Sequence, residues 1–466
     1  MTPDEEGLFP FDLVLDPNTH YFLFIGEARY DPLNPFMREA LERRTGRRMD
    51  YVAVIPDVSG CRLPRNTLVV NPAAKNLLAR TGMVIKSPMT AREFAAAASA
   101  SATVRELART LARDQGEVFV HVAESVPELT LRRMPGLRLI GPDGEVAAMW
   151  NNRLFQLRML RDLVPQIEHR HCRSLEETAE AVRDLLPKWP HGVRVMKESA
   201  GEEERYFVAK SPSDMALTHP GVDCPAFLYR HVPHEHAPTV LGVTAGENDV
   251  FIAAVADRQM ERGVLWGASY PSVLPEHIVT EVREHARMAG KVLGGSGYRG
   301  VFGCDFIVDK DGAVHFVEIN ARKHGAALEM CCTLESALPT GAPTLADLEL
   351  CAVFENRLPE SAVELTRALE GLFWRTRNVR APRDMVAEDG PERPKDVRAL
   401  FRHVLSRGAG HGMIILEPPA RACLIGKGGL LGRVVAVAGD PAYLAEDIEI
   451  GRRILLSSCQ DAPANG

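Results

Sequence analysis

The sequence lacks the features that would place the protein in a membrane or outside a cell. It contains no stretch of 18 apolar residues, and it starts with Asp4, Glu5 and Glu6 instead of the basic and apolar segments of a secretory signal. Its nine cysteines are spread thinly, and no two of them have the Cys-x-x-Cys spacing of many metal and redox sites. We therefore expect reduced, buried thiols in a cytoplasmic protein with no membrane partner.

Positive charge is not in excess either. The 55 Lys and Arg residues face 62 Asp and Glu residues, which gives a net charge of −7 at pH 7 and argues against a nucleic-acid partner. Internal repeats and low-complexity tracts are also absent. With 45% hydrophobic and 25% charged residues over 466 positions, the composition is that of a globular protein with two to four domains.

The first 149 residues alternate between strand-like and helix-like segments. The helix-like segments are amphipathic at 35–44 and Ala-rich at 91–112. The strand-like segments are short apolar runs that end in turn residues, at 21–25, 51–55, 118–122 and 137–140. This alternation predicts a parallel sheet with helices on its faces.

Two middle segments, 150–232 and 233–345, have more closely spaced strand patterns. In the first, 193–197 and 206–209 flank a short loop and predict an antiparallel pair. In the second, the apolar spacing over 275–293 predicts an amphipathic helix.

The last segment, 346–466, changes character again. It begins with a helical stretch at 346–372, which leads to a charged linker or surface loop at 380–398. Strand patterns at 412–416 and 433–437 and a final helix near 441–456 then predict a small α/β unit. The whole chain is therefore of the α/β (α+β) class.

The most informative stretch is 302–322. Two β-rich runs flank Asp311-Gly312, a pair of residues that favours a two-residue type I′ hairpin turn. That turn would place Lys310 opposite Ala313 and, further along the hairpin, Asp305 directly opposite Glu318. Asn320 would lie on the same face as Glu318.

Two opposed carboxylates repel each other and cost up to about 1 kcal/mol when unpaired. Apolar neighbours such as Phe306 and Ile319 indicate that the pair is at least half-buried, which raises that cost. Two carboxylates and an amide oxygen suit Mg²⁺ or Mn²⁺, so Asp305, Glu318 and Asn320 are candidate metal ligands. The alternative is a solvated outer face on which acidic residues alternate by chance, and we expect that of Asp309 near the tip.

The run Gly303-Cys-Asp305-Phe306, followed by the hairpin and by Glu318-Ile-Asn320-Ala-Arg322, resembles the metal motif of the ATP-grasp superfamily. The resemblance implies an ATP-grasp fold in four parts. These would be an N-terminal Rossmann-like pre-ATP-grasp domain (1–149), a central lid subdomain (150–232), a metal- and phosphate-binding subdomain (233–345) and a small C-terminal α/β extension (346–466). It further implies that Asp305, Glu318 and Asn320 hold Mg²⁺ against the ATP phosphates, while Arg322 steadies the phosphoryl group in transfer.

The resemblance also implies roles for residues outside the hairpin. Arg153 stands where the family has a phosphate-binding lysine, and Lys197 ends a strand that resembles the one whose lysine reaches the α- and β-phosphates. The loop after Lys197 departs from the family, because residues 198–204 contain one glycine and four acids. The remaining implied contacts are adenine at Arg230, His231 and Val232, ribose at Glu235, and phosphate at Arg258.

The activity implied by the resemblance is ATP-dependent ligation of a carboxylate to an amine, through an acyl phosphate and with release of ADP and phosphate. The substrates would be small molecules, an amino acid or peptide, and a homodimer is common among such enzymes. The C-terminal module is similar to that of stand-alone ligases such as the pheganomycin-type peptide ligase. Two alternatives stay open: a kinase on the same fold, and an ATP-binding regulatory module without turnover, which the acidic loop and Arg153 favour.

Overall fold

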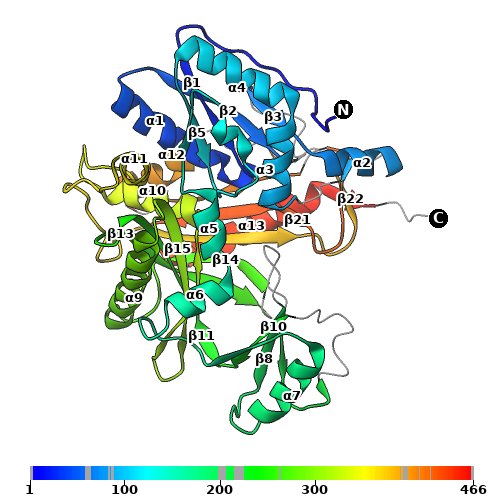
Figure 1. The fold of residues 1–466 in the computed structure, drawn as a ribbon, viewed down its shortest axis with the longest axis vertical. Helices are drawn as coiled ribbons and strands as arrows, with labels where there is room; N and C mark the ends of the chain where they lie inside the picture. Colours follow the sequence, from blue (N-terminus) through cyan, green and yellow to red (C-terminus); the bar gives the residue numbers. More distant parts are fainter. Residues whose placement is uncertain are drawn as a thin grey trace.

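The computed structural model describes residues 4–57, 65–81, 84–85, 89–197, 206–214, 225–261, 264–388, 390–391, 397–408, 410–419 and 421–462. Along the longest axis, Figure 1 shows the N-terminal sheet at one end, a small sheet at the other, and a large sheet between them. Within the described residues, we find no helix with the length and apolar character needed to cross a membrane.

The N-terminal part is a parallel sheet whose two faces are both covered. Its elements are β1 (His20–Ile25), η1 (Ala28–Leu33), α1 (Asn34–Thr45), β2 (Met49–Ile55), β3 (Thr67–Val69), α2 (Pro72–Thr81), β4 (Val84–Ile85), α3 (Ala91–Ala100), α4 (Ala102–Gln115), β5 (Val118–Val122), η2 (Thr130–Arg133) and β6 (Leu137–Ile140). The strand order is β3-β2-β1-β5-β6, and every pair is parallel. Phe22 and Phe24 pack with α1, while Leu23 and Ile25 pack with α3 and α4. The predicted Rossmann-like arrangement is confirmed.

The Ala-rich segment is two helices where one was predicted. α3 ends at Ala100, and the Ser101 side chain accepts a hydrogen bond from the Val104 backbone amide and caps the start of α4. A serine in this position favours a new helix start, because it satisfies an amide that the first turn leaves free.

A small antiparallel sheet follows two short helices. The elements are α5 (Gly144–Trp150), α6 (Arg153–Met159), β7 (His169–Cys172), α7 (Leu175–Leu185), β8 (Val193–Lys197), β9 (Tyr206–Ala209) and β10 (Ala226–Arg230). The strand order is β7-β10-β8-β9, and the predicted antiparallel pair of β8 with β9 is confirmed. We call β7 to β10 with α7 the lid; it lies at the end opposite the N-terminal sheet (Figure 1).

The large sheet carries the predicted metal hairpin. Its first elements are β11 (His234–His236), β12 (Pro238–Gly246), β13 (Asp249–Glu261), β14 (Val264–Tyr270), α9 (Glu276–Gly295), β15 (Gly300–Asp309), β16 (Val314–Asn320), α10 (Ala327–Ala337) and α11 (Leu345–Glu355). α9 matches the predicted helix, and its apolar face, including Val282 and Ala286, packs against Val240 and Phe302 of the sheet. This packing fixes the back of the strands that carry the carboxylates.

The C-terminal residues continue the same sheet. They form β17 (Phe373–Arg380), β18 (Met385–Ala387), α12 (Val397–Arg407), β19 (His411–Leu416), β20 (Cys423–Ile425), β21 (Leu430–Ala438), η3 (Pro441–Tyr443), α13 (Leu444–Ser457) and β22 (Cys459–Asp461). The large sheet runs β11-β15-β12-β13-β14-β17-β21-β19, with β16 beside β15, while β18, β20 and β22 form a second sheet with β4 of the N-terminal part. The last segment is therefore joined by strand pairing to the N-terminal part, through β4, and to the large sheet, through β14.

Two predictions for this segment need correction. The helix predicted over 346–372 ends at Glu355, because Asn356 takes a left-handed conformation with φ +53° and ends α11. The charged stretch 380–398 is only partly loop: β17 ends in it, and β18 pairs with both β20 and β22.

Candidate active site

The hairpin of β15 and β16 brings the predicted carboxylates together. Asp305 lies directly opposite Glu318, and Gly303 lies opposite Asn320. Asn320 Nδ2 donates a hydrogen bond to Asp305 Oδ2 over 3.1 Å. The three predicted metal ligands therefore form one cluster on one face of the hairpin.

The turn of this hairpin differs from the prediction. Asp309, not Lys310, pairs with Ala313, because the Asp309 backbone amide donates to the Ala313 carbonyl over 3.1 Å. Only Gly312 has a positive φ, +85°, whereas a type I′ turn needs two such residues. The Asp309 carboxylate accepts hydrogen bonds from the Asp311 and Ala313 amides and from His315, so it stabilises a wider turn and is not simply solvated.

A bulge explains why the carboxylate pairing is nevertheless correct. Near the tip Phe306 lies opposite Phe316, one position away from the predicted register, and the register shifts between Asp305 and Phe306. Val317 is the additional residue on β16. The wider turn and the bulge have opposite effects on the register, so that Asp305 and Glu318 meet.

Two arginines neutralise the carboxylates. Arg258 Nη1 lies 2.8 Å from Asp305 Oδ2, and Arg153 Nη2 lies 2.7 Å from Glu318 Oε2. Thr239 Oγ1 also donates to Asp305 Oδ1 over 2.6 Å. The repulsion from which we predicted a metal is therefore already offset by protein cations, and the metal assignment depends on the chemistry of the donors alone.

The electrostatics differ between the two carboxylates. Burial, opposed by Arg258, raises the pKa of Asp305 above its ordinary value. Burial is also the largest single effect on Glu318, but Arg153 and Arg258 outweigh it, so the pKa of Glu318 is lowered. Glu318 is therefore held as an anion, which is the form in which a carboxylate binds a cation.

The donor set fits a hard divalent cation. Asp305 and Glu318 supply carboxylate oxygens, and the Asn320 amide oxygen is an acceptor because the amide nitrogen donates to Asp305. Among the described residues, no group of three or more His, Cys, Asp or Glu side chains could hold a metal ion. The candidate centre consists of two acids and one amide, so a phosphate and water would have to complete the shell.

Arg153 connects the carboxylates to the lid. It opens α6, where the Asn152 side chain caps the helix by accepting from the Phe155 amide. Its Nη1 lies 3.0 Å from Met196 Sδ of β8, and its guanidinium lies over the ring of Tyr229 in β10. A group that is bound between Glu318 and the lid would therefore meet Arg153.

Arg322 follows β16 and lies at the border with the N-terminal part, beside Glu124. Its Nε lies 3.4 Å from Glu124 Oε2, and about a third of its side chain is exposed. The charge of Arg322 also contributes to the lowered pKa of Glu318. Its positive charge therefore contributes to the electrostatic potential at Glu318.

The two cations that the prediction places in the lid, Lys197 and Arg230, are the last residues of β8 and β10. Lys197 is exposed at the end of β8, and strand alternation places it on the face opposite to Met196. Arg230 pairs with Glu168, with Nε and Oε2 2.8 Å apart. The roles of Lys197 and Arg230 therefore rest on the resemblance alone, and the acidic loop 198–204 lies outside the described residues.

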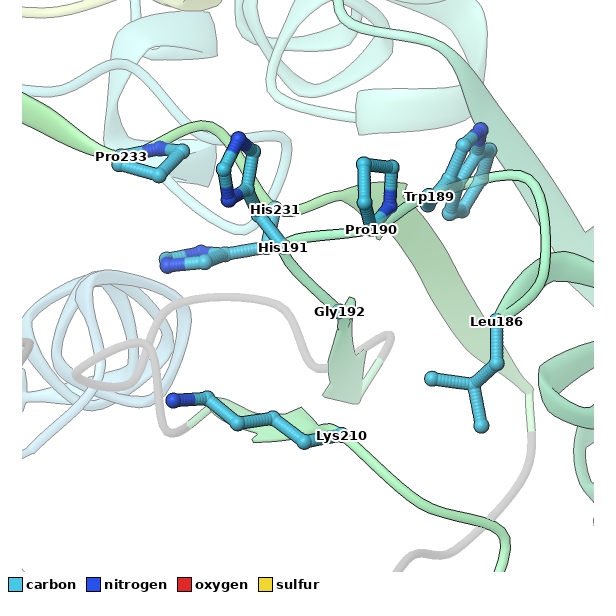
Figure 2. Close-up of a pocket in the computed structure, with 8 residues that line it drawn as sticks. All are labelled: Leu186, Trp189, Pro190, His191, Gly192, Lys210, His231 and Pro233. Carbon is cyan, nitrogen blue, oxygen red and sulfur yellow. The ribbon is translucent and has the colours of Figure 1, made fainter.

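The other three predicted nucleotide contacts follow β10. Val232 is buried, Glu235 is exposed in β11, and the His231 amide donates to the Gly192 carbonyl over 3.0 Å. Figure 2 shows His231 beside His191 and above Lys210. These three residues and Trp189 line a cavity of about 280 Å³. Burial, with help from neighbouring cations, lowers the pKa of His231.

Two residues of the site, Gln156 and Thr239, were not predicted. Gln156 exchanges two hydrogen bonds with the backbone of Ile319, at 2.7 and 2.8 Å, and so fixes β16 between the two predicted ligands Glu318 and Asn320. Thr239 lies opposite Asp305 on the neighbouring strand β12. Neither residue belongs to a local motif, so only the order of strands in the sheet could have identified them.

Comparison with known proteins agrees with this fold. No protein-family model matches the chain. The L-propargylglycine–L-glutamate ligase of Streptantibioticus cattleyicolor is 36% identical over 89 residues, which are 19% of this chain and 18% of that protein. The match thus spans under a fifth of the relative's length.

Solved structures are similar over nearly the whole chain. The ADP complex of an N5-carboxyaminoimidazole ribonucleotide synthetase covers 96% of this chain and 99% of its own, with a TM-score of 0.60 and 14% identity. The Aspergillus clavatus N5-carboxyaminoimidazole synthase with ADP and 5-aminoimidazole ribonucleotide covers 94% of this chain and 100% of its own, with a TM-score of 0.57 and 15% identity. The Campylobacter jejuni biotin carboxylase complex covers 95% of this chain and 91% of its own, with a TM-score of 0.57 and 13% identity. These likenesses show that the chain has the ATP-grasp fold.

Proposed function

We propose that this ATP-grasp chain is an ATP-dependent, ADP-forming carboxylate–amine ligase. The observation that carries the proposal is the cluster of Asp305, Glu318 and Asn320 with Arg258 and Arg153 around it and Arg322 beyond it. Three oxygen donors together with three cationic side chains suit a polyphosphate and its metal ion better than they suit a structural role. The solved structures of the same fold include complexes with ADP.

In the proposed reaction ATP and a substrate carboxylate meet at this cluster. When Mg²⁺ or Mn²⁺ is bound by Asp305, Glu318 and Asn320, it neutralises phosphate charge. Arg153 holds the phosphates of ATP beside Glu318, and the role of Lys197 as a second cation from the lid rests on the resemblance alone. Arg322 stabilises the γ-phosphoryl group as it moves to the carboxylate oxygen, and an amine then displaces phosphate to give the amide.

We further propose that the substrates are amino acids or small peptides. The relative with 36% identity is by its name a ligase of propargylglycine and glutamate, although the match is short. The adenine and ribose contacts at Arg230, His231, Val232 and Glu235 are part of the same proposal.

The test is to incubate the protein with Mg-ATP, hydroxylamine and a pool of amino acids and other metabolites, followed by mass spectrometry. Hydroxylamine replaces the unknown amine, so a new hydroxamate that forms together with ADP would establish acyl-phosphate chemistry and identify the acid. A stable phosphorylated product without a hydroxamate would indicate a kinase. Bound ATP without any product would indicate a regulatory module and refute the ligase.

Two variants make this test specific. Glu318→Gln should lower turnover by about 10²-fold or more, which is the scale lost with one strong electrostatic contact. Asp311→Asn is the matched control, because Asp311 is an exposed carboxylate at the tip of the same hairpin. Turnover should be unchanged in that variant, and equal losses in both would contradict the site.

A further inference from the structure

The short segment that carries Arg322 is held from two directions. We call residues 321–326, between β16 and α10, the arginine loop. From the N-terminal part, Tyr30 Oη donates to the Lys323 carbonyl over 2.9 Å, and the Lys323 amide donates to the Ala123 carbonyl over 3.1 Å. These contacts hold the first half of the loop, next to Arg322.

The second half of the loop is held by the C-terminal segment. Arg433 of β21 donates through Nη1 to the Gly325 carbonyl, and its Nη2 lies 2.9 Å from Glu329 Oε2 in the first turn of α10. One guanidinium therefore joins the arginine loop to the helix that follows it. α10 has no side-chain cap at Ala326, and the Ala326 amide instead donates to His324 Nδ1 of the same loop over 3.1 Å.

The bridge lies in a place where its loss has a large effect. Glu329 is fully buried, and 12% of the Arg433 side chain is exposed. Arg433 is also the one charged residue of β21, a strand of otherwise apolar residues and one glycine. Without the guanidinium, a buried carboxylate loses its countercharge and a loop carbonyl loses its donor, so the loop and the start of α10 must rearrange.

We propose that Arg433 is a positioning residue for Arg322, and that the C-terminal segment takes part in catalysis through it. This inference rests on the proposed function, in which Arg322 stabilises the phosphoryl group in transfer. The Arg322 side chain starts from the backbone of the arginine loop, so a shift of that backbone would move the guanidinium away from Glu124, whose Oε2 lies 3.4 Å from Nε.

Arg433→Met removes the bridge, and Arg398→Met is the matched control. Arg398, on α12, is also a C-terminal arginine with two ion pairs to other parts of the chain, to Glu39 and Glu335, but neither pair touches the arginine loop. Both variants should lower the melting temperature. Arg433→Met alone should speed hydrogen exchange at the amides of residues 323–327, by about tenfold or more.

Turnover gives the second measurement, with the acid that the wild type converts to a hydroxamate. Arg433→Met should lower kcat by about 10- to 100-fold, as expected for a misplacement of about 1 Å, with KM for ATP within about twofold of the wild type. Arg433→Lys should recover part of the stability through Glu329 but not kcat, because an ammonium has no fork with which to hold both groups. It also carries the test if Arg433→Met does not fold.

Two results would overturn the inference. One is hydrogen exchange in the arginine loop that is equal in the Arg433 and Arg398 variants. The other is a loss of kcat that is as large in Arg398→Met as in Arg433→Met. Hydrogen exchange needs no substrate, so it shows whether Arg433 holds the loop even if the wild type makes no hydroxamate. A wild type that makes no hydroxamate would refute the proposed function, not this inference.

Discussion

Gly303 is the position where the smallest change should have the clearest effect. A Cβ atom at this residue would lie 2.4 Å from Cδ2 of His324, with Cγ and Cβ of the same ring residue at 3.2 and 3.3 Å. His324 is buried and belongs to the arginine loop, two residues after Arg322. Gly303, which pairs with Asn320 across the hairpin, has no room for a side chain because the His324 imidazole lies against its backbone.

The magnitude for Gly303→Ala follows from this geometry. The His324 ring must retreat by about 1 Å to restore ordinary van der Waals contact. Overpacking of this kind costs about 1–3 kcal/mol of the free energy of unfolding. Since the ring carries the arginine loop with it, turnover should fall by about 10²-fold.

Denaturant unfolding and ATP turnover are the assays, and Gly295→Ala is the control. At Gly295 a Cβ would meet only the side chain of Glu247, at 3.7 Å or more, so alanine should be tolerated at the end of α9. The double variant Gly303→Ala/His324→Ala should be more stable than the sum of the two single effects predicts, because the second change removes the clash. Additive effects, or wild-type stability in Gly303→Ala, would refute the reasoning.

Three further predictions concern buried charge. Burial lowers the pKa of His324 to about 3, so below pH 6.5 the unfolded chain binds a proton that the native state does not. As the pH falls from 6.5, this residue should lower the free energy of unfolding by about 1.4 kcal/mol per pH unit. His324→Gln should remove that part of the slope, and an unchanged slope between pH 6 and 4 would contradict the prediction. Lys323→Met should lower the free energy of unfolding by about 3–5 kcal/mol, because Glu349, 2.5 Å from Lys323 Nζ, would remain buried without this partner. The double variant Lys323→Met/Glu349→Leu should unfold at a higher denaturant concentration than Lys323→Met, and the reverse order would contradict the ion pair. The affinity for Mn²⁺, measured by electron paramagnetic resonance, should be at least about tenfold higher with ATP than without it, since the arginines already neutralise Asp305 and Glu318. Equal affinities would contradict that charge balance.

Local patterns predicted the fold where one segment carries its own signal. Four of the five parallel N-terminal strands, the amphipathic helix α9 and the hairpin of β15 and β16 each follow from the pattern of one continuous segment, whereas the short strand β3 was not predicted. The break at Ser101 was missed because a helical pattern continues on both sides of a capping serine. The end of α11 at Asn356 was missed because leucines and alanines after it mimic helical spacing, although they pack as an irregular segment against the large sheet.

Pairings between distant segments could not be predicted in this way. The C-terminal segment reads as a separate unit, because nothing local shows that β17 pairs with β14 or that β20 pairs with β4. The same limit hides Arg433, whose partners lie about a hundred residues earlier in the chain. Its signal was a single arginine in an apolar strand, which identifies a residue in need of a partner without saying which.

The carboxylate pair shows this difference at the scale of one site. Opposed acids in an apolar hairpin must be neutralised, and that need was visible in the sequence. What neutralises them was not, because Arg258 comes from β13 and Arg153 from α6, and only the tertiary fold brings them to Asp305 and Glu318. With both arginines in place the cluster has no net charge, so a divalent cation alone would leave it positive. A polyphosphate would restore the balance by drawing the arginines toward itself, and this is a physical reason why metal and nucleotide should bind to this site together.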